Sequence, residues 1–205
     1  MMHPAVGLVL AYLLGSIPFA YMAGKLTRGI DLRQHGSGNL GATNVYRVLG
    51  WKIALIVFVL DTAKGALPVA LFPRWFNAQP ADYWAIAYGV AAIIGHVVPV
   101  FMLFRSGGKG VATAGGVFLA LAPVPFLIAF GVWIAVLFAS GYVSVASLIG
   151  ATTLAIALIV MRGSTSPIAI IGVALAVFVF WTHRANIGRL RRGEEHRFGR
   201  KTPGA

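Results

Sequence analysis

A polar, glycine-rich run, GSGNLGATNVYR at residues 36–47, lies between two long apolar segments. Glycine lets a backbone turn tightly and approach a ligand closely. Arg47 brings a planar guanidinium, whose fork of donors suits a phosphate group. Beside Gly38, four side chains supply hydroxyl or amide groups, namely Ser37, Asn39, Thr43 and Asn44. These residue types predict a short loop that binds an anion.

A second polar run, RSGGKG at residues 105–110, is typical of a helix amino terminus that binds an anion. Unpaired backbone N–H groups and the positive end of the helix dipole favour negative charge there. Lys109 adds a compact positive charge beside Gly107, Gly108 and Gly110. Arg105 and Lys109 could also simply mark a cytoplasmic loop. Two cationic, glycine-rich loops in one chain favour the anion site.

Three residues near the carboxyl end, His183, Asn186 and Leu190, have the spacing of one helix face. His183 could bind a substrate hydroxyl or take its proton, and Asn186 lies one turn away. A histidine that only satisfies its own hydrogen bonds is an equally good explanation, because the sequence fixes neither the tautomer nor the distances.

Two charged residues, Asp61 and Lys64, lie three positions apart within a long apolar segment. Ionisable groups inside a membrane are costly and are functional candidates by default. Here the spacing allows the two to pair with each other, so we predict a structural ion pair. His96 lies in the next apolar segment, and the sequence leaves its role undecided.

Several common catalytic patterns do not fit the chain. The G-x-G-x-x-G at residues 36–41 follows an apolar segment rather than the strand that a dinucleotide fold requires. No His-x₄-Asp pair and no complete serine-hydrolase pattern occur, and there is no cysteine. The five carboxylates are not clustered as metal ligands. We therefore predict chemistry without a serine nucleophile, a metal or a cofactor.

The composition is that of an integral membrane protein. The 205 residues are 59% hydrophobic with a mean hydropathy of +0.83, and only 11% are charged. Soluble domains are about a quarter charged. A net charge of +12 is compatible with nucleic-acid binding, but basic loops facing anionic lipid explain it better. Membrane lipid is the predicted partner, and nucleic acid is not.

Apolar segments long enough to cross a bilayer lie at residues 4–24, 53–73, 83–104 and 164–182. The first polar loop and the tail are basic, which places both in the cytoplasm. The uncharged block at residues 111–161 must then cross an odd number of times, and its length favours three. Its expected breaks, near Pro123–Pro125 and at Ser140–Gly141, leave two of its helices short.

The prediction is an all-α, polytopic membrane protein of seven transmembrane helices, with the N-terminus outside and the C-terminus cytoplasmic. It forms one integral membrane domain, residues 1–205, in which 14 of the 17 basic residues are cytoplasmic. Four polar segments then share one face and can converge on one interfacial site: residues 25–52, 105–110 and 140–144, and the tail 184–205. A transporter would more naturally place polar groups near the midplane.

Three separated segments resemble the signature sequences of the bacterial acyl-phosphate:glycerol-3-phosphate acyltransferases. They are GSGNLGATNVYR, GGKGVATAGG, and HRANIGRL with the following Gly-x-Glu that ends at Glu195. The segments LD-x-x-KG at residues 60–65 and GHVVPVF at residues 95–101 are similar to further parts of that family. The resemblance therefore covers nearly the whole chain, and small departures such as Leu40, where proline is common, touch no proposed catalytic group.

This resemblance implies an enzyme of the bacterial inner membrane with its active site at the cytoplasmic face. The reaction it implies moves a fatty acyl group from acyl phosphate to the 1-hydroxyl of glycerol 3-phosphate. Lysophosphatidic acid and phosphate are the products, with no covalent acyl-enzyme, cofactor or protein partner. The implied catalytic residues are Ser37, Arg47, Lys109, His183 and Asn186, with a hydroxyl from Ser144 or Ser147 and a structural Glu195. A transporter of phosphate or an organophosphate is the alternative, with the glycine loops as gates.

Overall fold

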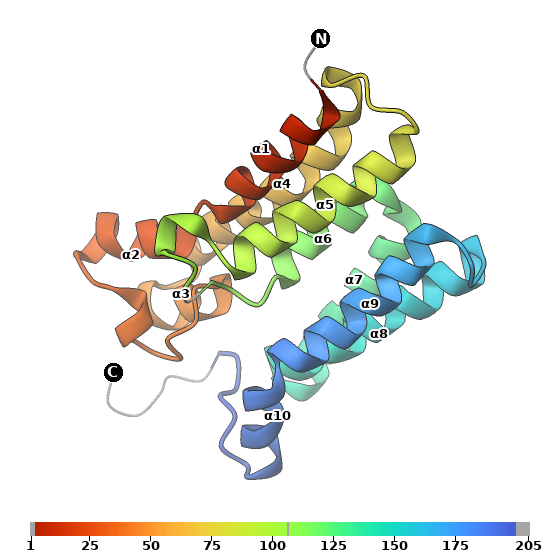
Figure 1. The fold of residues 1–205 in the computed structure, drawn as a ribbon. Coiled ribbons are helices and arrows are strands. Elements are labelled where there is room, and N and C mark those ends of the chain that lie inside the picture. The colour runs from red at the N-terminus through yellow and green to blue at the C-terminus, as the bar shows by residue number, and fades with distance from the viewer. Residues whose placement is uncertain (1–2, 106, 200–205) are drawn as a thin grey trace. The chain divides into compact units, whose positions relative to one another are not determined.

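The structure is a computed structural model that describes residues 3–105 and 107–199. Ser106 and residues 200–205 of the tail lie outside the described part, as do Met1 and Met2. The described part is all helical, with α-helices and two short 3₁₀ turns, η1 and η2 (Figure 1). Their bounds are α1 Pro4–Ser16, α2 Phe19–Arg28, η1 Leu32–Gln34, α3 Ala42–Leu49, α4 Trp51–Trp75, α5 Ala81–Val97, η2 Val100–Met102, α6 Val111–Leu121, α7 Pro123–Ser140, α8 Val143–Arg162, α9 Pro167–Thr182 and α10 Arg184–Arg191.

The chain divides into two compact units, Met1–Leu121 and Ala122–Ala205. In the first unit α1 packs against α5, and α4 packs against both α5 and α6. A Cβ on Gly65 would overlap the carbonyl oxygen of Thr113, so glycine allows α4 and α6 to approach closely. Because Thr113 closely follows the second polar run, this close packing holds the amino end of α6 against α4.

The first apolar segment is broken at Ile17 and Pro18, which separate α1 from α2. Lys64 of α4 donates from Nζ to the carbonyl oxygen of Ile17 at 2.8 Å, which places a positive charge at the carboxyl end of α1. The same Nζ lies 2.9 Å from Oδ1 of Asp61, and both side chains are only 2% exposed. The contact that the spacing of Asp61 and Lys64 predicted is therefore present.

The polar segment expected at residues 25–52 contains helical structure of its own. It begins with the end of α2, passes through η1 and includes all of α3. Gly29, with φ of +68°, ends α2 in the left-handed conformation that favours glycine. The buried residues of α3, Asn44, Val45 and Leu49, face inward at helical spacing, so this half of the segment is an amphipathic helix.

In the second unit α8 packs against α7 and α9. The helix breaks lie where the sequence predicted them, at Ala122 before Pro123 and at Gly141 after Ser140. The expectation of two short helices was wrong for α7, because α6 has 11 residues but α7 has 18. Proline is favoured in the first turn of a helix, so Pro123 starts α7 after a break of one residue. At His183 the chain bends by 55° from α9 into α10.

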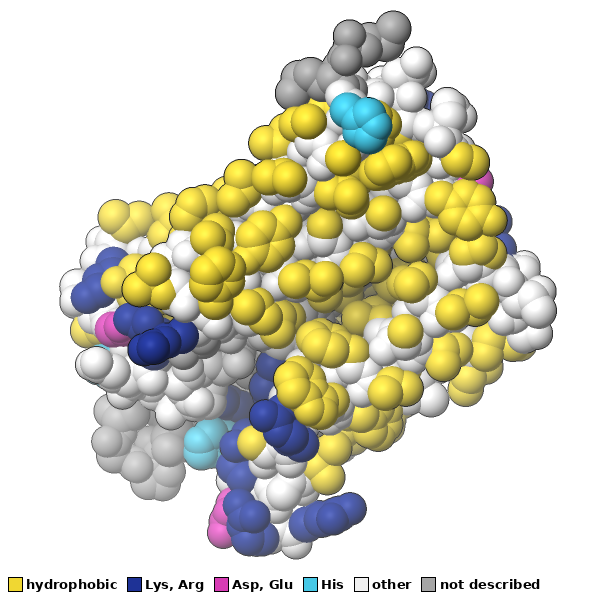
Figure 2. Space-filling view, in the orientation of Figure 1, with side chains coloured by type: hydrophobic (Ala, Val, Ile, Leu, Met, Phe, Trp, Pro, Cys, Tyr) yellow, Lys and Arg dark blue, Asp and Glu magenta, His cyan; other side chains and the backbone are white. Residues whose placement is uncertain are grey.

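Among the described residues, five helical segments are long and apolar enough to cross a membrane: Pro4–Arg28, Trp51–Trp75, Ala81–Met102, Pro123–Ser140 and Val143–Arg162. The bent pair of α9 and α10 would make a sixth, and α6 is a shorter apolar helix. Large apolar side chains are exposed on these helices, such as Leu55 and Val59 of α4 and Phe138 of α7. Hydrophobic side chains also cover much of the face drawn in Figure 2. Such surfaces suit hydrocarbon rather than water.

The buried pair in α4 gives a first prediction. Lys64→Met should lower the thermal unfolding midpoint of the detergent-solubilised protein, because it leaves the Asp61 carboxylate buried without its cation. Breaking a buried ion pair in this way costs about 3–5 kcal/mol. Lys52→Met is the matched control, because Lys52 is an exposed lysine of the same helix. Equal midpoints for the two variants would contradict a stabilising role for the pair.

Candidate active site

The loop formed by residues 36–41 is held together by the amide of Asn44, which is buried. Oδ1 of Asn44 accepts from the backbone N–H of Ser37 at 2.8 Å. Nδ2 donates to the carbonyl oxygens of His35 at 3.0 Å and Leu32 at 3.3 Å. Gly36 has φ of +62°, and a Cβ there would overlap Oδ1 of Asn44. The amide that the sequence offered as an anion ligand thus shapes the loop in this structure.

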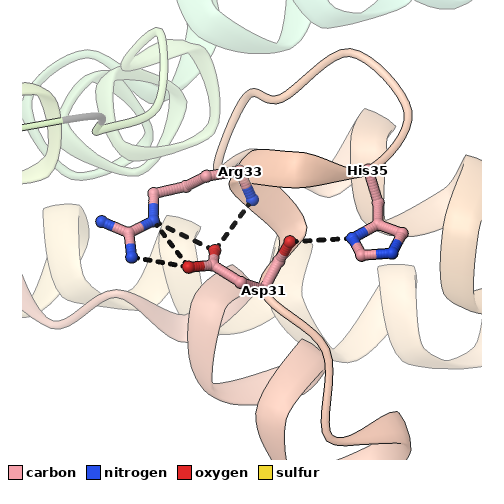
Figure 3. A network of polar contacts seen from close by, with 3 residues as sticks. All are labelled: Asp31, Arg33 and His35. Carbon is pink, nitrogen blue, oxygen red and sulfur yellow. Dashed lines mark hydrogen bonds and ion pairs between the residues drawn. The ribbon is translucent and has the colours of Figure 1, made fainter.

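The chain just before this loop is fixed by Asp31, Arg33 and His35 (Figure 3). The Asp31 carboxylate accepts from the backbone N–H of Arg33 at 3.0 Å and from its guanidinium at 2.6–3.1 Å. The carbonyl oxygen of Asp31 lies 2.9 Å from Nδ1 of His35. Hydrogen bonds from Arg33 outweigh the opposing effect of burial and lower the pKa of Asp31 to about 2. Asp31 therefore remains a carboxylate at physiological pH and holds the chain in place just before the loop.

The two glycine-rich loops meet in the first unit. We call residues 107–110 the GGKG loop. The backbone N–H of Gly108 donates to the carbonyl oxygen of His96 at 3.2 Å, and a Cβ on Gly108 would lie 3.0 Å from the carbonyl oxygen of Leu40. A cavity of about 10 Å³ lies here, and its lining includes Leu40, Gly108, Asp61, Lys64 and His96. Such a volume corresponds to about one water molecule.

Two cationic residues predicted for the site belong to the two polar runs that meet here. Arg47 is half-buried on α3, and Lys109 is half-buried in the GGKG loop. Gly110 has φ of +80°, and its carbonyl oxygen accepts the N–H of Ala114 in the first turn of α6. The GGKG loop therefore leads directly into the amino terminus of α6, the arrangement that favours an anion. Thr43, like Arg47, lies on α3, and Asn39 lies in the preceding loop.

In the second unit, the carboxylate of Glu195 joins two side chains of α10 to one at the start of α8. Oε1 accepts from Nδ2 of Asn186 at 2.6 Å and from Oγ of Ser144 at 3.0 Å. Oε2 accepts from Nε of Arg189 at 2.7 Å. Ser144, Asn186 and Glu195 are all buried. The network ties the amino end of α8 to α10 and the segment that follows it.

The structure separates the two serines that the sequence left as alternatives. Ser144 belongs to the Glu195 network, whereas Oγ of Ser147 donates to the carbonyl oxygen of Val143 at 2.8 Å. Ser147 also lies 3.3 Å from Nε1 of Trp133, which donates to it from α7. Of the two hydroxyls, only that of Ser144 shares a carboxylate with Asn186 in this structure.

His183 lies at the bend between α9 and α10 and is buried. Its Nδ1 is 2.8 Å from the carbonyl oxygen of Val179. A carbonyl can only accept, so Nδ1 donates and, in the neutral ring, the lone pair lies on Nε2. The His183 and Asn186 side chains are thus both oriented by the protein, one through the end of α9 and the other through Glu195.

Sequence reasoning missed two contributors. Arg189 was counted only as a basic tail residue, yet it is the cation paired with Glu195. Its position three residues after Asn186 was the available signal. His96 was left without a role, yet it contacts the GGKG loop, and no pattern over the intervening residues could have revealed this.

The predicted site residues are divided between the two units. Ser37, Arg47, Lys109 and the glycine-rich loops belong to Met1–Leu121, and Ser144, His183 and Asn186 belong to Ala122–Ala205. Within the described residues no three His, Cys, Asp or Glu side chains are grouped as metal ligands.

Long apolar helices and basic, glycine-rich loops define a multi-pass integral membrane protein with an enzyme-like polar site. A family model described as glycerol-3-phosphate acyltransferase matches residues 5–193. The chain belongs to the glycerol-3-phosphate acyltransferase family. It is 44% identical over 198 residues to glycerol-3-phosphate acyltransferase of Synechococcus elongatus, covering 94% of this chain and 93% of the relative. It is 48% identical over 183 residues to glycerol-3-phosphate acyltransferase 2 of Bacillus cereus, covering 89% and 88%.

Solved structures give the same result. The chain matches the crystal structure of PlsY, an integral membrane glycerol 3-phosphate acyltransferase, in its glycerol 3-phosphate form. That match has a TM-score of 0.87 at 40% identity and covers 96% of each chain. The lysophosphatidic acid form of PlsY matches with a TM-score of 0.82 at 39% identity, covering 96% of this chain and 95% of the other.

The Glu195 network predicts a pH-dependent stability. Burial raises the pKa of Glu195, but hydrogen bonds from Asn186, Arg189 and Ser144 and the charge of Arg189 outweigh it, so the pKa lies below 4.5. A carboxyl group whose pKa is lower in the folded than in the unfolded protein stabilises the folded state at pH values above its unfolded-state pKa. This contribution is lost as the pH falls through the folded-state pKa. Glu195→Gln should therefore lower the free energy of unfolding at neutral pH by about 1.5–3 kcal/mol. The change is measured as a lower thermal unfolding midpoint.

The difference between the wild type and Glu195→Gln should narrow as the pH falls through the lowered pKa of Glu195, because the protonated wild-type side chain, like glutamine, carries no charge. Glu194→Gln is the control, because Glu194 pairs with Arg192 at an exposed position. A gap between wild type and Glu195→Gln that persists unchanged at low pH would show that the charge of Glu195 is not what stabilises the network.

Proposed function

We propose that this chain transfers a fatty acyl group from acyl phosphate to the 1-hydroxyl of glycerol 3-phosphate. The main support is the likeness, at 40% identity over 96% of the chain, to PlsY in its glycerol 3-phosphate form. The second PlsY structure is a lysophosphatidic acid form, and that molecule is the product of the proposed reaction. The curated relatives are themselves named glycerol-3-phosphate acyltransferases.

In the proposed reaction the 1-hydroxyl oxygen of glycerol 3-phosphate attacks the acyl carbonyl carbon. An ester bond forms, the bond from the acyl carbon to the phosphate oxygen breaks, and the hydroxyl proton departs with the released phosphate. Acyl phosphate is a mixed anhydride with a good leaving group, so no acyl-enzyme is required. The protein's task is to gather and align two anions, and such alignment can supply up to roughly 7–11 kcal/mol.

Each residue that the resemblance implies as catalytic has a place in this scheme. Arg47, Lys109, Ser37 and the GGKG loop amides bind phosphate groups, as their charge and donors suit. His183 offers Nε2 to the substrate hydroxyl, because its Nδ1 faces the carbonyl oxygen of Val179. Asn186, oriented by the hydrogen bond from its Nδ2 to Glu195, is the second polar group that we assign to the substrate hydroxyl. Ser144 is the hydroxyl we assign to this part of the site.

We also propose the finer architecture. The five long segments, α9 and the short α6 together make seven crossings, and α10 belongs to the cytoplasmic tail. With the basic loops inside, the N-terminus lies outside, the C-terminus is cytoplasmic, and the active site faces the cytoplasm at the bacterial inner membrane. The two units act as one functional domain, and the reaction needs no cofactor or protein partner. The apolar helix surfaces would carry the acyl chain.

The activity can be tested with purified protein given palmitoyl phosphate and glycerol 3-phosphate, without added metal or coenzyme A. We expect lysophosphatidic acid and phosphate in equal amounts. Arg47→Ala and Lys109→Ala should each lower the rate by about a hundred- to a thousandfold, as loss of a preorganised donor does. Arg28→Ala and Lys52→Ala, at exposed basic positions, are the matched controls.

A transporter of phosphate or an organophosphate would behave differently in the same experiment. It would carry the substrate into sealed vesicles and form no ester. Uptake without lysophosphatidic acid would reject the transferase. Full turnover by folded Arg47→Ala and Lys109→Ala would instead reject the site while leaving the activity intact.

The two serines give a further prediction. Ser144→Ala should lower kcat/KM by about tenfold or more, because it removes a donor from the carboxylate that orients Asn186 and such bonds are worth about 1.5–3 kcal/mol. Ser147→Ala should have a smaller effect, since Ser147 contacts Val143 and Trp133 instead. Both variants should be compared by steady-state kinetics and thermal midpoint. The reverse order of effects would contradict the assignment of Ser144.

A further inference from the structure

His96 lies near the carboxyl end of α5, is only 7% exposed, and has no part in the scheme above. Its ring lies between the buried ion pair of α4 and the GGKG loop. On one side, Nδ1 is 3.6 Å from Oδ1 of Asp61. On the other side, a Cβ added to Gly108 would overlap Nε2. The imidazole therefore connects a rigid, buried carboxylate to a loop proposed to bind phosphate.

The Asp61 carboxylate is paired with a cation of the same helix. Lys64 lies 2.9 Å from Oδ1 of Asp61 but directs its hydrogen bond to the carbonyl oxygen of Ile17. Oδ1 of Asp61 is buried, and no donor among the described residues is aligned for a hydrogen bond to it. A carboxylate can only accept, so it favours the ring tautomer with the proton on Nδ1, facing it. The ring thus lies with Nδ1 toward Asp61 and Nε2 toward the loop.

The main chain at His96 holds the same loop. Its carbonyl oxygen accepts the N–H of Gly108 at 3.2 Å. A Cβ on Gly107 would overlap the carbonyl oxygens of His96 and Val97, so the loop lies directly against the end of α5. Lys109 is the next residue along the chain. A shift of the ring or of the end of α5 would therefore be transmitted to the cation and amides of the GGKG loop.

We propose that His96 is a positioning residue, fixed by Asp61, that holds the GGKG loop in the conformation that binds the phosphate group of a substrate. The proposal rests on the proposed function and names a contributor to it outside the polar loops. The phosphate could be that of glycerol 3-phosphate or that of acyl phosphate. Because His96 acts through the loop, its loss should weaken binding more than it slows the chemical step.

The test is steady-state kinetics of His96→Ala with each substrate varied in turn. We expect the KM for one phosphorylated substrate to rise about tenfold or more, with a smaller change in kcat. The substrate whose KM rises is the one held by the loop. His96→Asn places an amide donor near the position of Nδ1, so its KM should rise less than that of His96→Ala. Tyr88→Phe is the control, because it removes a buried hydrogen bond, to the carbonyl oxygen of Pro4, from the same helix.

A double-variant cycle with Gly108→Ala checks the contact directly. Gly108→Ala should be severe alone, because its Cβ meets the ring, and milder in the His96→Ala background, where the ring is gone. With an active wild type, His96 variants that lose only kcat would overturn the proposal. So would His96 variants that lose no more activity than Tyr88→Phe at equal thermal stability. An inactive wild type would instead reject the proposed function.

Discussion

A polar group buried among apolar helices can be satisfied only by another part of the protein, because hydrocarbon offers no hydrogen-bond partner. In the first unit the buried Lys64 meets this constraint by pairing with Asp61 and donating to the carbonyl oxygen of Ile17, which connects α4 to the carboxyl end of α1. His96 brings α5 to the same carboxylate. Helices α1, α4 and α5 are thus joined at one buried charge cluster, which lies beside the cavity where the two glycine-rich loops meet.

The second unit follows the same rule outside the long helices. Glu195 is buried and negatively charged, and it is stable there because Asn186, Arg189 and Ser144 all donate to it. The side chains thereby oriented include Asn186, which the family resemblance implies at the active site. His183 is fixed independently, through Val179 in the last turn of α9. Orientation by neighbours that do not themselves react is what a positioning enzyme requires.

Acyl transfer from a mixed anhydride places modest chemical demands on the protein, and the architecture is consistent with this. The proposed mechanism uses cations, amides and oriented hydrogen-bonding groups rather than a covalent intermediate. Such groups act most strongly when they are held in place before the substrate arrives. The ties described for Asn44 and Asn186 hold site segments in this way. In the proposed scheme His96 extends this support to the GGKG loop.

Much of this could be predicted from the sequence alone. Composition determined the membrane class, proline and glycine determined the breaks at Ala122 and Gly141, and the i,i+3 spacing predicted the Asp61–Lys64 contact, because each is a property of the chain as a whole or of residues within one turn. Tertiary structure decided the rest. Ser144 reaches Glu195 across 51 positions in sequence, and His96 meets Gly108 from the end of another helix. Such contacts depend on how helices pack, and local periodicity carries no information about partners that far along the chain.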